Sequence, residues 1–479
     1  RIHPMPRTLP ALLLAFASLP AAAATFSVTS LDAGGAGSLR AAILAANAAG
    51  DATGPHRIEF TAAYPLNGEI ELFTALPRIN VIAEIDGNGR APVLRPFDTT
   101  QDLRLLASSD ALTLRRFTLQ QGRAAGGGGC LASDGAGSVD SLVLDRMRFV
   151  GCLATGSGAT NASGGAVRWS AVASVGVFET VFEANAAAHI GTGAGTGGAM
   201  AVSGPLLVQS SRFIDNATNG GFTSGGAISW LGATASTVEI RDSVFIGNFA
   251  VPEAGGSGFG GALALDCPNC TLSIVRSYFG GNRSADAGAV FARGNNGEGS
   301  AQITLENLSF VGNRVSGGGG ALTTQGARLV GRHLSFFSNQ ADLGAHLTTS
   351  STQLVEWSNS AMAPKRAGSG NACALSSAAA STLGTLLGTG DSSCSVGLPG
   401  AVAVSDFQII GVDEAATMPV LAFETTSPAV DGANAARCLP TDTRGVARPQ
   451  DGNGDGSATC DVGAFELQAT ELFADGFED

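Results

Sequence analysis

A single unit recurs seven times between Phe149 and Leu347 and limits what this chain can fold into. In each copy a Phe is followed three residues later by a polar position, and after a short insert by Gly-Gly-Ala or a looser form of it. The Phe positions are separated by 33, 31, 32, 34, 31 and 26 residues: Phe149, Phe182, Phe213, Phe245, Phe279, Phe310 and Phe336. The polar positions are Cys152, Asn185, Asn216, Asn248, Asn282, Asn313 and Asn339. This internal period predicts stacked copies of one structural unit in place of separate globular domains.

Each copy contains three short runs of β-branched or aromatic residues. In the unit spanning 225–248 these runs are 227–230, 237–240 and 243–245. Three short strands with bends between them describe one coil of a parallel β-helix. Such runs cannot bury a face alone, so the coils must stack in register. We therefore predict an all-β fold, a right-handed single-stranded parallel β-helix of the pectin-lyase-like solenoid type, with its handedness taken from the rule for parallel crossovers.

The marked positions of the repeat have structural explanations. We expect the Asn side chains to hydrogen-bond from coil to coil, at a bend where Asn tolerates the left-handed region of backbone space. Gly-Gly-Ala indicates a close backbone approach followed by a small inward side chain. The array is expected to start one coil earlier, with Phe117 in the Phe position and Gln120 in the Asn position. On this interpretation the array is a scaffold, and we expect function in the residues that it holds on its surface.

One amphipathic helix is predicted ahead of the array. Ser38 is suited to cap its start, and Asn47 with Gly50 is suited to end it. Its apolar face is expected to comprise Leu39, Ala42, Ile43 and Ala46. A short N-terminal capping helix of this kind can cover the open hydrophobic end of a strand stack.

Composition and charge narrow the choice of partner and compartment. The net charge is −13, Lys365 is the single lysine, and no basic run exists, which excludes nucleic acid as an expected partner. The first 24 residues resemble a secretory signal peptide, with Arg7, an apolar run at 11–19 and small residues at 22–24. That run is too short to span a bilayer, and no later stretch is a transmembrane candidate. We expect a monomer that is secreted or held at the cell surface after signal-peptide cleavage.

Export makes the eight cysteines candidates for disulfides. They fall into four local pairs along the chain: Cys130 and Cys152, Cys267 and Cys270, Cys373 and Cys394, Cys438 and Cys460. Cys130 replaces Ala of Gly-Gly-Ala and Cys152 replaces the first Asn, so a disulfide between neighbouring coils would explain both departures. A metal site at Cys267-Pro-Asn-Cys270 ranks below a small disulfide loop, because no second Cys pair or His pair completes it.

The chain divides into six expected segments. They are a signal peptide at 1–24, an N-terminal cap with first coils at 25–111, the repeat array at 112–354, an irregular closing segment at 355–400, a C-terminal module at 401–467 and a tail at 468–479. The acidic, aromatic tail resembles terminal sorting tags of exported proteins, and a frayed terminus explains it equally well.

Two sets of residues are candidates for binding. The variable inserts after each Asn leave the stack at one corner, and their distinctive residues are His189, Phe222, Glu253 and Phe259; the alternative is that they are solvated linkers. A second line stands three residues before each Phe: Arg146, Glu179, Ser210, Asp242, Arg276, Asn307 and His333. These polar residues face outward if Phe faces inward, and they either bind an extended glycan or form the solvated side of a strand. The candidate ligand-facing residues are Arg146, Glu179, Asp242, Arg276 and His333.

Several segments resemble known families. The run 38–47, with 57–60 and 85–87, resembles the N-terminal region of exported bacterial CSLREA-domain proteins, although Gly37 and Ala41 stand where that name has Cys and Glu. Three blocks at 427–431, 442–449 and 460–466 resemble the choice-of-anchor Q domain, and the repeats are similar to those of polymorphic outer-membrane adhesins. The resemblance implies a β-helix fold and export, and it does not imply a particular activity.

An acidic run near the C-terminus is a candidate calcium site. Asp451, Asn453 and Asp455 alternate with glycines as in the start of a calcium loop. The position where an EF-hand requires Glu holds Val462, so Asp461 or Glu466 would have to complete the site in another geometry. The predicted metal ligands are Asp451, Asn453, Asp455 and Asp461, with Ca²⁺ as the ion; the alternative is an acidic surface turn.

Catalysis is weighed because pectate lyases and polygalacturonases share the predicted fold. A lyase needs a base facing a calcium-bound uronate, and an inverting hydrolase needs paired carboxylates. The sequence offers Arg241-Asp242, Asp145-Arg146 and Asp215, but shows no carboxylates recurring at one corner of successive coils. No catalytic residue is assigned. We predict a binding or adhesion role toward glycans, with a polysaccharide lyase or glycoside hydrolase as the alternative.

Overall fold

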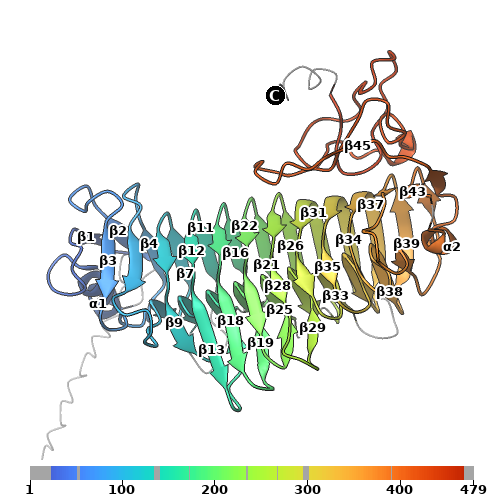
Figure 1. Cartoon of the computed structure of the whole chain (residues 1–479). Helices are drawn as coiled ribbons and strands as arrows, with labels where there is room; N and C mark the ends of the chain where they lie inside the picture. Colours follow the sequence, from blue (N-terminus) through green and yellow to red (C-terminus); the bar gives the residue numbers. More distant parts are fainter. Residues whose placement is uncertain are drawn as a thin grey trace, which may run out of the picture.

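The computed structural model describes residues 23–50, 54–133, 141–171, 173–232, 236–266, 268–294, 301–389 and 391–468. These residues form an elongated parallel β-helix, with the N-terminal coils at one end and the last coils at the other (Figure 1). The predicted fold class is confirmed. The predicted signal peptide, apart from its last two residues, and the tail from 469 onward lie outside the described residues.

The main sheet of the solenoid contains two successive strands of nearly every coil, with a bend between them. Among the described residues it has 23 strands. They are β1 (Thr25–Val28), β2 (His56–Phe60), β3 (Glu69–Leu72), β4 (Ala83–Asp86), β5 (Val93–Pro96), β7 (Leu112–Arg115), β8 (Thr118–Gln120), β11 (Leu142–Asp145), β12 (Arg148–Val150), β16 (Val175–Phe178), β17 (Val181–Glu183), β21 (Leu206–Gln209), β22 (Arg212–Ile214), β26 (Thr237–Arg241), β27 (Val244–Ile246), β31 (Thr271–Gly280), β34 (Gln302–Val311), β37 (Arg328–Phe337), β39 (Gln353–Ser358), β40 (Ala361–Met362), β42 (Thr382–Leu383), β43 (Leu386–Gly388) and β44 (Val402–Val404).

Three further parallel sheets complete the coils. The first holds β6 (Leu106–Ser108), β10 (Leu131–Ser133), β15 (Val167–Ser170), β20 (Met200–Ser203), β25 (Ile228–Leu231), β30 (Leu263–Asp266), β33 (Val290–Arg293), β36 (Leu322–Gln325), β38 (Leu347–Ser350) and β41 (Cys373–Ala374). The second holds β9 (Arg123–Ala125), β13 (Leu153–Ser157), β18 (Ala186–Ile190), β23 (Ala217–Asn219), β28 (Phe249–Ala250), β32 (Arg283–Ser284) and β35 (Arg314–Val315). The third, built from the longer inserts, holds β14 (Ala162–Ser163), β19 (Ala194–Thr196), β24 (Phe222–Ser224) and β29 (Ser257–Phe259).

The seven Phe side chains of the repeat form one continuous stack inside the solenoid. All are completely buried, and neighbouring rings lie nearly parallel with centroids 4.8 to 5.1 Å apart. Burial of each ring contributes about 1.5–3 kcal/mol. In the coil before the stack, Leu119 pairs with Phe149, so the expectation that Phe117 occupies the Phe position is wrong by two residues. Spacings that vary between copies make the period a poor guide to register.

The Asn side chains form a hydrogen-bonded ladder beside the Phe stack, as predicted. In an interior rung, Asn216 Oδ1 accepts from Asn185 Nδ2 at 2.9 Å and from Asn185 N at 3.1 Å. Asn216 Nδ2 donates to Phe182 O and to Asn248 Oδ1, each at 3.0 Å. Every polar atom of the buried amide therefore has a partner, which removes the cost of burying it.

The left-handed bend lies one residue before each Asn, and not at Asn itself as predicted. Positive φ angles occur at Ala184 (53°), Asp215 (52°) and Ser338 (54°), and at glycines in the remaining coils. No Asn of the ladder has a positive φ, and each of these side chains is buried, where it joins the ladder. The Gly-Gly-Ala expectation is confirmed: a Cβ on Gly198 would lie 2.0 Å from Gly226 O, and Ala199 is completely buried.

Both ends of the Asn ladder are closed by other residues. At the first end Cys152 N donates to Asn185 Oδ1 at 2.9 Å. At the last end Asn339 Nδ2 lies 3.3 Å from His346 Nδ1, and His346 Nε2 lies 2.7 Å from Ala363 O. These partners place the proton of His346 on Nε2. Burial lowers the pKa of His346 to about 4, so the ring is neutral and accepts the last amide proton.

The capping helix forms as predicted. Helix α1 (Leu39–Ala49) is capped by Ser38, whose side chain accepts from Ala41 N at 3.2 Å. Its four predicted apolar residues are buried, and the helix packs against β1 and β2 at the first coil. This helix therefore covers the N-terminal end of the hydrophobic interior.

The other end of the solenoid is more regular than the predicted closing segment. Strands β39, β40, β42, β43 and β44 continue the main sheet past residue 354, and α2 (Ser393–Gly397) lies beside β41, in the first of the three further sheets. Three of the predicted cysteine pairs are disulfides: Cys130–Cys152, Cys373–Cys394 and Cys438–Cys460. Cys270 is also disulfide-bonded, whereas its predicted partner Cys267 lies outside the described residues.

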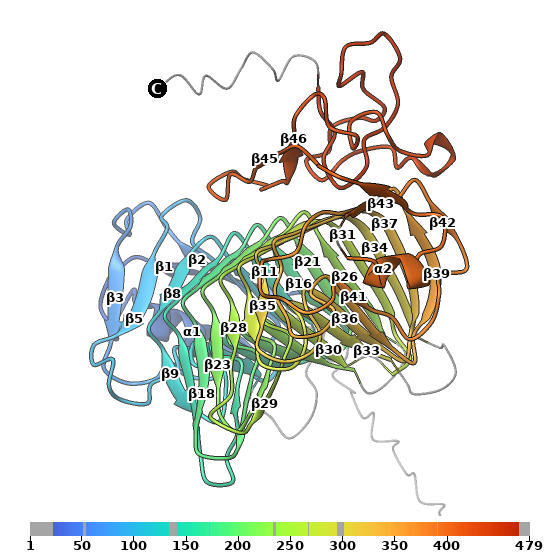
Figure 2. The ribbon, with the colours of Figure 1, turned by 45° about the vertical axis from the view of Figure 1, so that its right-hand side comes forward.

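The C-terminal module folds back over the outside of the solenoid (Figure 2). It contains the antiparallel pair β45 (Ile409–Gly411) and β46 (Ala422–Phe423) and the short 3-10 helix η1 (Ala435–Arg437). Apolar residues of the module pack on the outer face of the last coils, with Phe423 and Phe465 against a surface that includes Ala361 and Phe337. The module is therefore anchored to the main sheet by a second, smaller core.

Replacing one ring of the Phe stack tests its contribution to stability. Phe213→Ala is expected to lower the free energy of unfolding by about 3–5 kcal/mol, because it leaves a cavity inside the stack. Phe73→Ala is the matched control, since that ring is 62% exposed, and its effect should be far smaller. Chemical denaturation followed by circular dichroism measures both. Equal losses in the two variants would contradict the assigned role of the stack.

Candidate ligand-binding surface

The predicted polar line is a column of strained corners on the outside of the main sheet. One residue per coil adopts a left-handed conformation between the two strands of that sheet, with φ between 46° and 60°. We call this set the corner column: Arg116, Arg146, Glu179, Ser210, Asp242, Arg276, Asn307, His333 and Asn359. Such a conformation costs a non-Gly residue about 1–3 kcal/mol, and strain repeated in this way is a reason to look for function.

The first six residues of the corner column are accessible to solvent. Arg146, Glu179 and Ser210 are exposed, and the other three are partly exposed. Asp242 and Arg276 pair across neighbouring coils, with Arg276 Nε 2.7 Å from Asp242 Oδ1 and Nη2 3.0 Å from Oδ2. This hydrogen-bonded pair raises the pKa of Arg276. The open part of the column thus presents both donors and acceptors, one residue per coil.

A cluster of charges lies at the start of the column, and the sequence pattern indicated only its Asp145-Arg146 part. Asp86 is almost completely buried and accepts from Arg116 Nε at 2.9 Å, while Asp145 accepts from Arg146 Nε at 3.0 Å. Asp86, Arg115 and Asp145 align in register on three successive coils. The two-residue error in register at Phe117 concealed Arg116, because the correct count from Leu119 places it in the line.

The arginines set the charge state of the two carboxylates. Burial by itself would raise the pKa of Asp86, but hydrogen bonds from Arg116 and Asn88 and the nearby positive charges lower it overall. The pKa of Asp145 is likewise lowered by Arg146 and Arg115 against the effect of burial. Asp86 and Asp145 are therefore ionised at neutral pH, and each is hydrogen-bonded to an arginine of the column.

The last three corners are covered by the C-terminal module. Asn307 Nδ2 donates to Thr441 O at 2.8 Å, and Thr443 Oγ1 donates to Asn307 O at 2.8 Å. Asn359 Oδ1 accepts from Asn434 N at 2.8 Å. His333 is completely buried, so it is not accessible to a ligand, which differs from its predicted position on the outer face. The module binds this part of the column largely through its own peptide groups.

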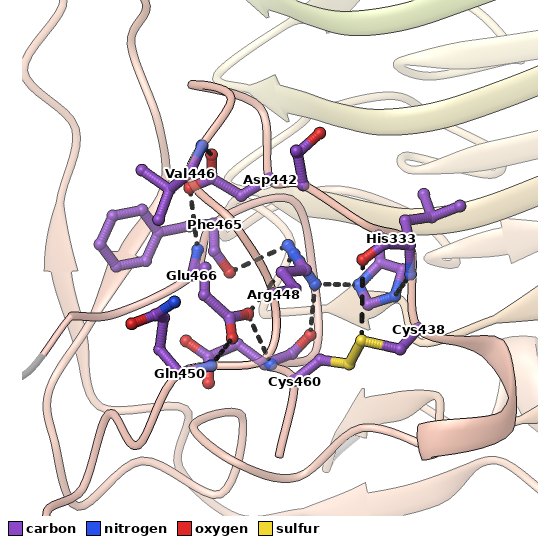
Figure 3. A network of polar contacts seen from close by, with 12 residues as sticks. His333, Cys438, Asp442, Val446, Arg448, Gln450, Cys460, Phe465 and Glu466 are labelled. Atoms are coloured by element: carbon purple, nitrogen blue, oxygen red, sulfur yellow. Dashed lines mark hydrogen bonds and ion pairs between the residues drawn. A yellow bond between two sulfur atoms is a disulfide. The ribbon is translucent and has the colours of Figure 1, made fainter. Parts of the chain in front are cut away.

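His333 joins the solenoid to a buried network of the module (Figure 3). Its Nε2 faces Asn359 Nδ2 at 3.1 Å and Leu439 N at 3.4 Å, and its Nδ1 lies 3.1 Å from Gly463 O and in contact with Arg448. Because both groups at Nε2 are donors, that nitrogen accepts. Burial, and then the charge of Arg448, hold the pKa of His333 well below its usual value.

Inside this network, residues of the C-terminal blocks form hydrogen bonds with one another. Arg448 donates to Asp461 O and Gly463 O, each at 2.9 Å. Asp461 N donates to Glu466 Oε2 at 2.9 Å, and Glu466 N donates to Asp442 Oδ2 at 3.1 Å. Buried charges are stable only with such partners. The blocks at 442–449 and 460–466 are thus parts of one folded unit.

The predicted calcium ligands do not form a single cluster. Asp451 and Asn453 close a turn by accepting from Gly456 N and Asp455 N, each at 2.9 Å. Asp461 is buried, and its carboxylate accepts from Asp431 N and Leu467 N. Burial and the neighbouring Glu466 raise the pKa of Asp461 to about 7. Across the ranges that the structure describes, no group of three or more His, Cys, Asp or Glu residues is arranged to hold a metal.

The distinctive residues of the variable inserts differ in their exposure. Glu253 is exposed, whereas His189 is buried within β18, with Nε2 3.2 Å from Gly158 O. Phe222 is 42% exposed, and its ring centroid lies 5.8 Å from that of Phe259. Phe291, which the repeat pattern does not indicate, extends this pair, with its ring centroid 5.1 Å from that of Phe259.

Comparisons with known proteins identify no relative that would assign a role to these residues. No family model matches the chain, and no curated protein matches it. In the part of the chain that the structure describes, no helix has both the length and the apolar character needed to cross a membrane.

Acid is expected to weaken docking of the C-terminal module through His333. Because its pKa is lower in the folded than in the unfolded chain, the folded chain binds fewer protons below about pH 6.5, and stability is lost as the pH falls. Asp461 acts in the opposite direction, since its raised pKa adds stability as the pH falls below about 7. Hydrogen exchange of residues 431–467 at about pH 7.5 and about pH 5 measures the balance.

Two variants isolate the His333 contribution. His333→Gln removes the titrating ring, so acid-induced exchange in the module should be reduced relative to the unmodified protein. His189→Gln, which changes a buried histidine outside the module, should leave that exchange unaltered. The same acid response in His333→Gln and in the unmodified protein would assign the effect to other groups.

Proposed function

We propose that this chain is an exported β-helix protein that binds an extended glycan along the open part of the corner column. The observation that carries the proposal is the outward corner that recurs once per coil, on a solenoid whose interior Phe rings repeat every 4.8 to 5.1 Å. Repeating binding groups on a rigid surface suit a repeating polymer, because each further unit meets a similar environment without a new ordering cost.

The mixture of groups favours a hydroxylated polymer. Arg146 and Arg276 donate, Glu179 and Asp242 accept, and Ser210 does both. A strongly charged polymer would meet unfavourable groups at every second or third coil, and the chain as a whole carries a charge of −13. A glycan offers both donors and acceptors, which matches this mixture of groups.

Export and cell-surface location belong to the same proposal. Three disulfides within the described residues fit an oxidising compartment, where such bonds persist. The resemblances to CSLREA-domain, choice-of-anchor Q and adhesin repeats point the same way. We propose a monomer that acts by binding or adhesion, after removal of the segment 1–24.

A polysaccharide lyase or glycoside hydrolase is the alternative. Its specific support is the row Asp86, Arg115 and Asp145 on successive coils. A general acid needs a raised pKa, whereas the pKa values of Asp86 and Asp145 are lowered, and an arginine base needs a lowered pKa, whereas that of Arg116 is raised. The electrostatics therefore favour binding over catalysis. New reducing or unsaturated ends after incubation with pectin, alginate or xylan would reverse this preference.

Variants of the corner column test the binding surface. Arg146→Ala and Glu179→Ala should each weaken binding to a glycan selected on an array by about tenfold or more, because a hydrogen bond to a charged group contributes about 1.5–3 kcal/mol. Arg328→Ala, an exposed arginine outside the column, is the control and should bind normally. Titration calorimetry measures all three. Unchanged affinity in both column variants would place the binding site elsewhere.

Calcium binding at residues 451–455 is also proposed. The turn presents the side-chain oxygens of Asp451, Asn453 and Asp455, the hard ligands that Ca²⁺ prefers. Calorimetry should show heat on addition of about millimolar Ca²⁺, in the affinity range of extracellular modules, and Asp451→Asn should abolish it. Absence of heat in the unmodified protein would make the turn a surface feature only.

A further inference from the structure

The two internal ladders end at a cavity near the last coils. Met362 pairs with Phe336 and so occupies the next Phe position. Lys365, three residues on, occupies the next Asn position, because Arg366 N donates to Asn339 O as Gln340 N does to Asn313 O. A flexible chain thus replaces a ring, and a long cation replaces a short amide. The stack of rings and the ladder of amides thus stop at this coil, and both Met362 and Lys365 line a cavity.

This space is a cavity of about 210 Å³ with two chemically different walls. Met362, Ala363 and Leu387 form an apolar wall, whereas Lys365, Thr389 and Asp391 supply polar groups. This volume is far above the roughly 10–15 Å³ that a single water molecule needs on the same measure, so the cavity has room for a small ring.

The polar wall is fixed in place before any ligand binds. Lys365 Nζ lies 2.7 Å from Asp391 Oδ2, and Asp391 also accepts from Ala372 N at 2.7 Å and Ser393 N at 2.9 Å. The disulfide Cys373–Cys394 joins the two segments that carry these amides. An ammonium group has three donors, and the contact with Asp391 uses one of them. The remaining donors are suited to acceptor oxygens of a ligand.

We propose that this cavity binds a single neutral sugar ring, such as the end unit of a glycan. A pyranose has an apolar C–H surface for the Met362 and Leu387 side and hydroxyl groups for Lys365, Thr389 and Asp391, in the way small-molecule sites combine apolar walls with a few placed polar groups. Pairing of Lys365 with Asp391 leaves the site without net charge, which favours a neutral over an acidic sugar. The proposal rests on the glycan-binding role proposed above and adds a site for the chain end.

The single lysine provides a direct test. Limited acetylation of the full chain, followed by mass spectrometry, reports the accessibility of the Lys365 amine, with the N-terminal amine as an internal control. Glucose, galactose, mannose, N-acetylglucosamine and galacturonate are the probes. At about ten times its dissociation constant, a bound neutral sugar should slow acetylation of Lys365 about tenfold without slowing that of the N-terminal amine.

Variants separate binding from unspecific protection. Thr389→Val removes one polar group from the mouth of the cavity and should reduce the protection, whereas Thr192→Val, at an exposed position of an insert, should not. Absence of protection by every neutral sugar, or protection by galacturonate alone, would overturn the proposal. Protection that is unchanged in Thr389→Val and does not saturate would overturn it as well.

The test of the cavity can fail or succeed independently of the test of the corner column. Loss of polysaccharide binding in Arg146→Ala together with no protection of Lys365 would reject the cavity and keep the proposed function. Protection of Lys365 with normal polysaccharide binding by the column variants would keep the cavity and reject the column as the binding face.

Discussion

The coil-to-coil hydrogen bonds of the Asn ladder hold the rest of the structure in register. Each amide is buried and has partners for all its polar atoms only when it lies opposite the amides of the coils before and after it. A shift of one residue would leave these groups unsatisfied, at a cost of about 1–3 kcal/mol each. The Phe stack adds hydrophobic stabilisation in the same register. The positions of residues on the outside of the solenoid are therefore fixed by the hydrogen bonds and ring packing of its interior.

The corner column illustrates this dependence. Its residues adopt left-handed backbone conformations that are unfavourable in isolation, and they persist because strands on both sides are fixed by the ladders. The solenoid uses the column in two ways. Asn307, His333 and Asn359 bind the C-terminal module, whereas the six earlier corners remain accessible. The same local geometry thus anchors a module at one end and leaves an accessible surface at the other.

Much of this architecture is predictable from the sequence, because the residue types at the repeated positions indicate how they pack and hydrogen-bond. The β-helix, the Phe and Asn ladders, the capping helix α1 and three disulfides follow from residue type and spacing. The left-handed residue before each Asn and the register of Leu119 do not, since backbone geometry and unequal inserts are invisible in a simple period. His333 was assigned to the surface because nothing local indicates that a segment about 130 residues later covers it.

The proposed function requires the interior ladders to hold a rigid row of binding groups on the outside of the solenoid. Hydrogen exchange of the protein with and without a bound glycan examines this most directly, because it reports each coil separately. The account predicts added protection at one short segment per coil, around residues 116, 146, 179, 210, 242 and 276, with little change in the inserts. Protection confined to the inserts, or to residues 401–467, would contradict it.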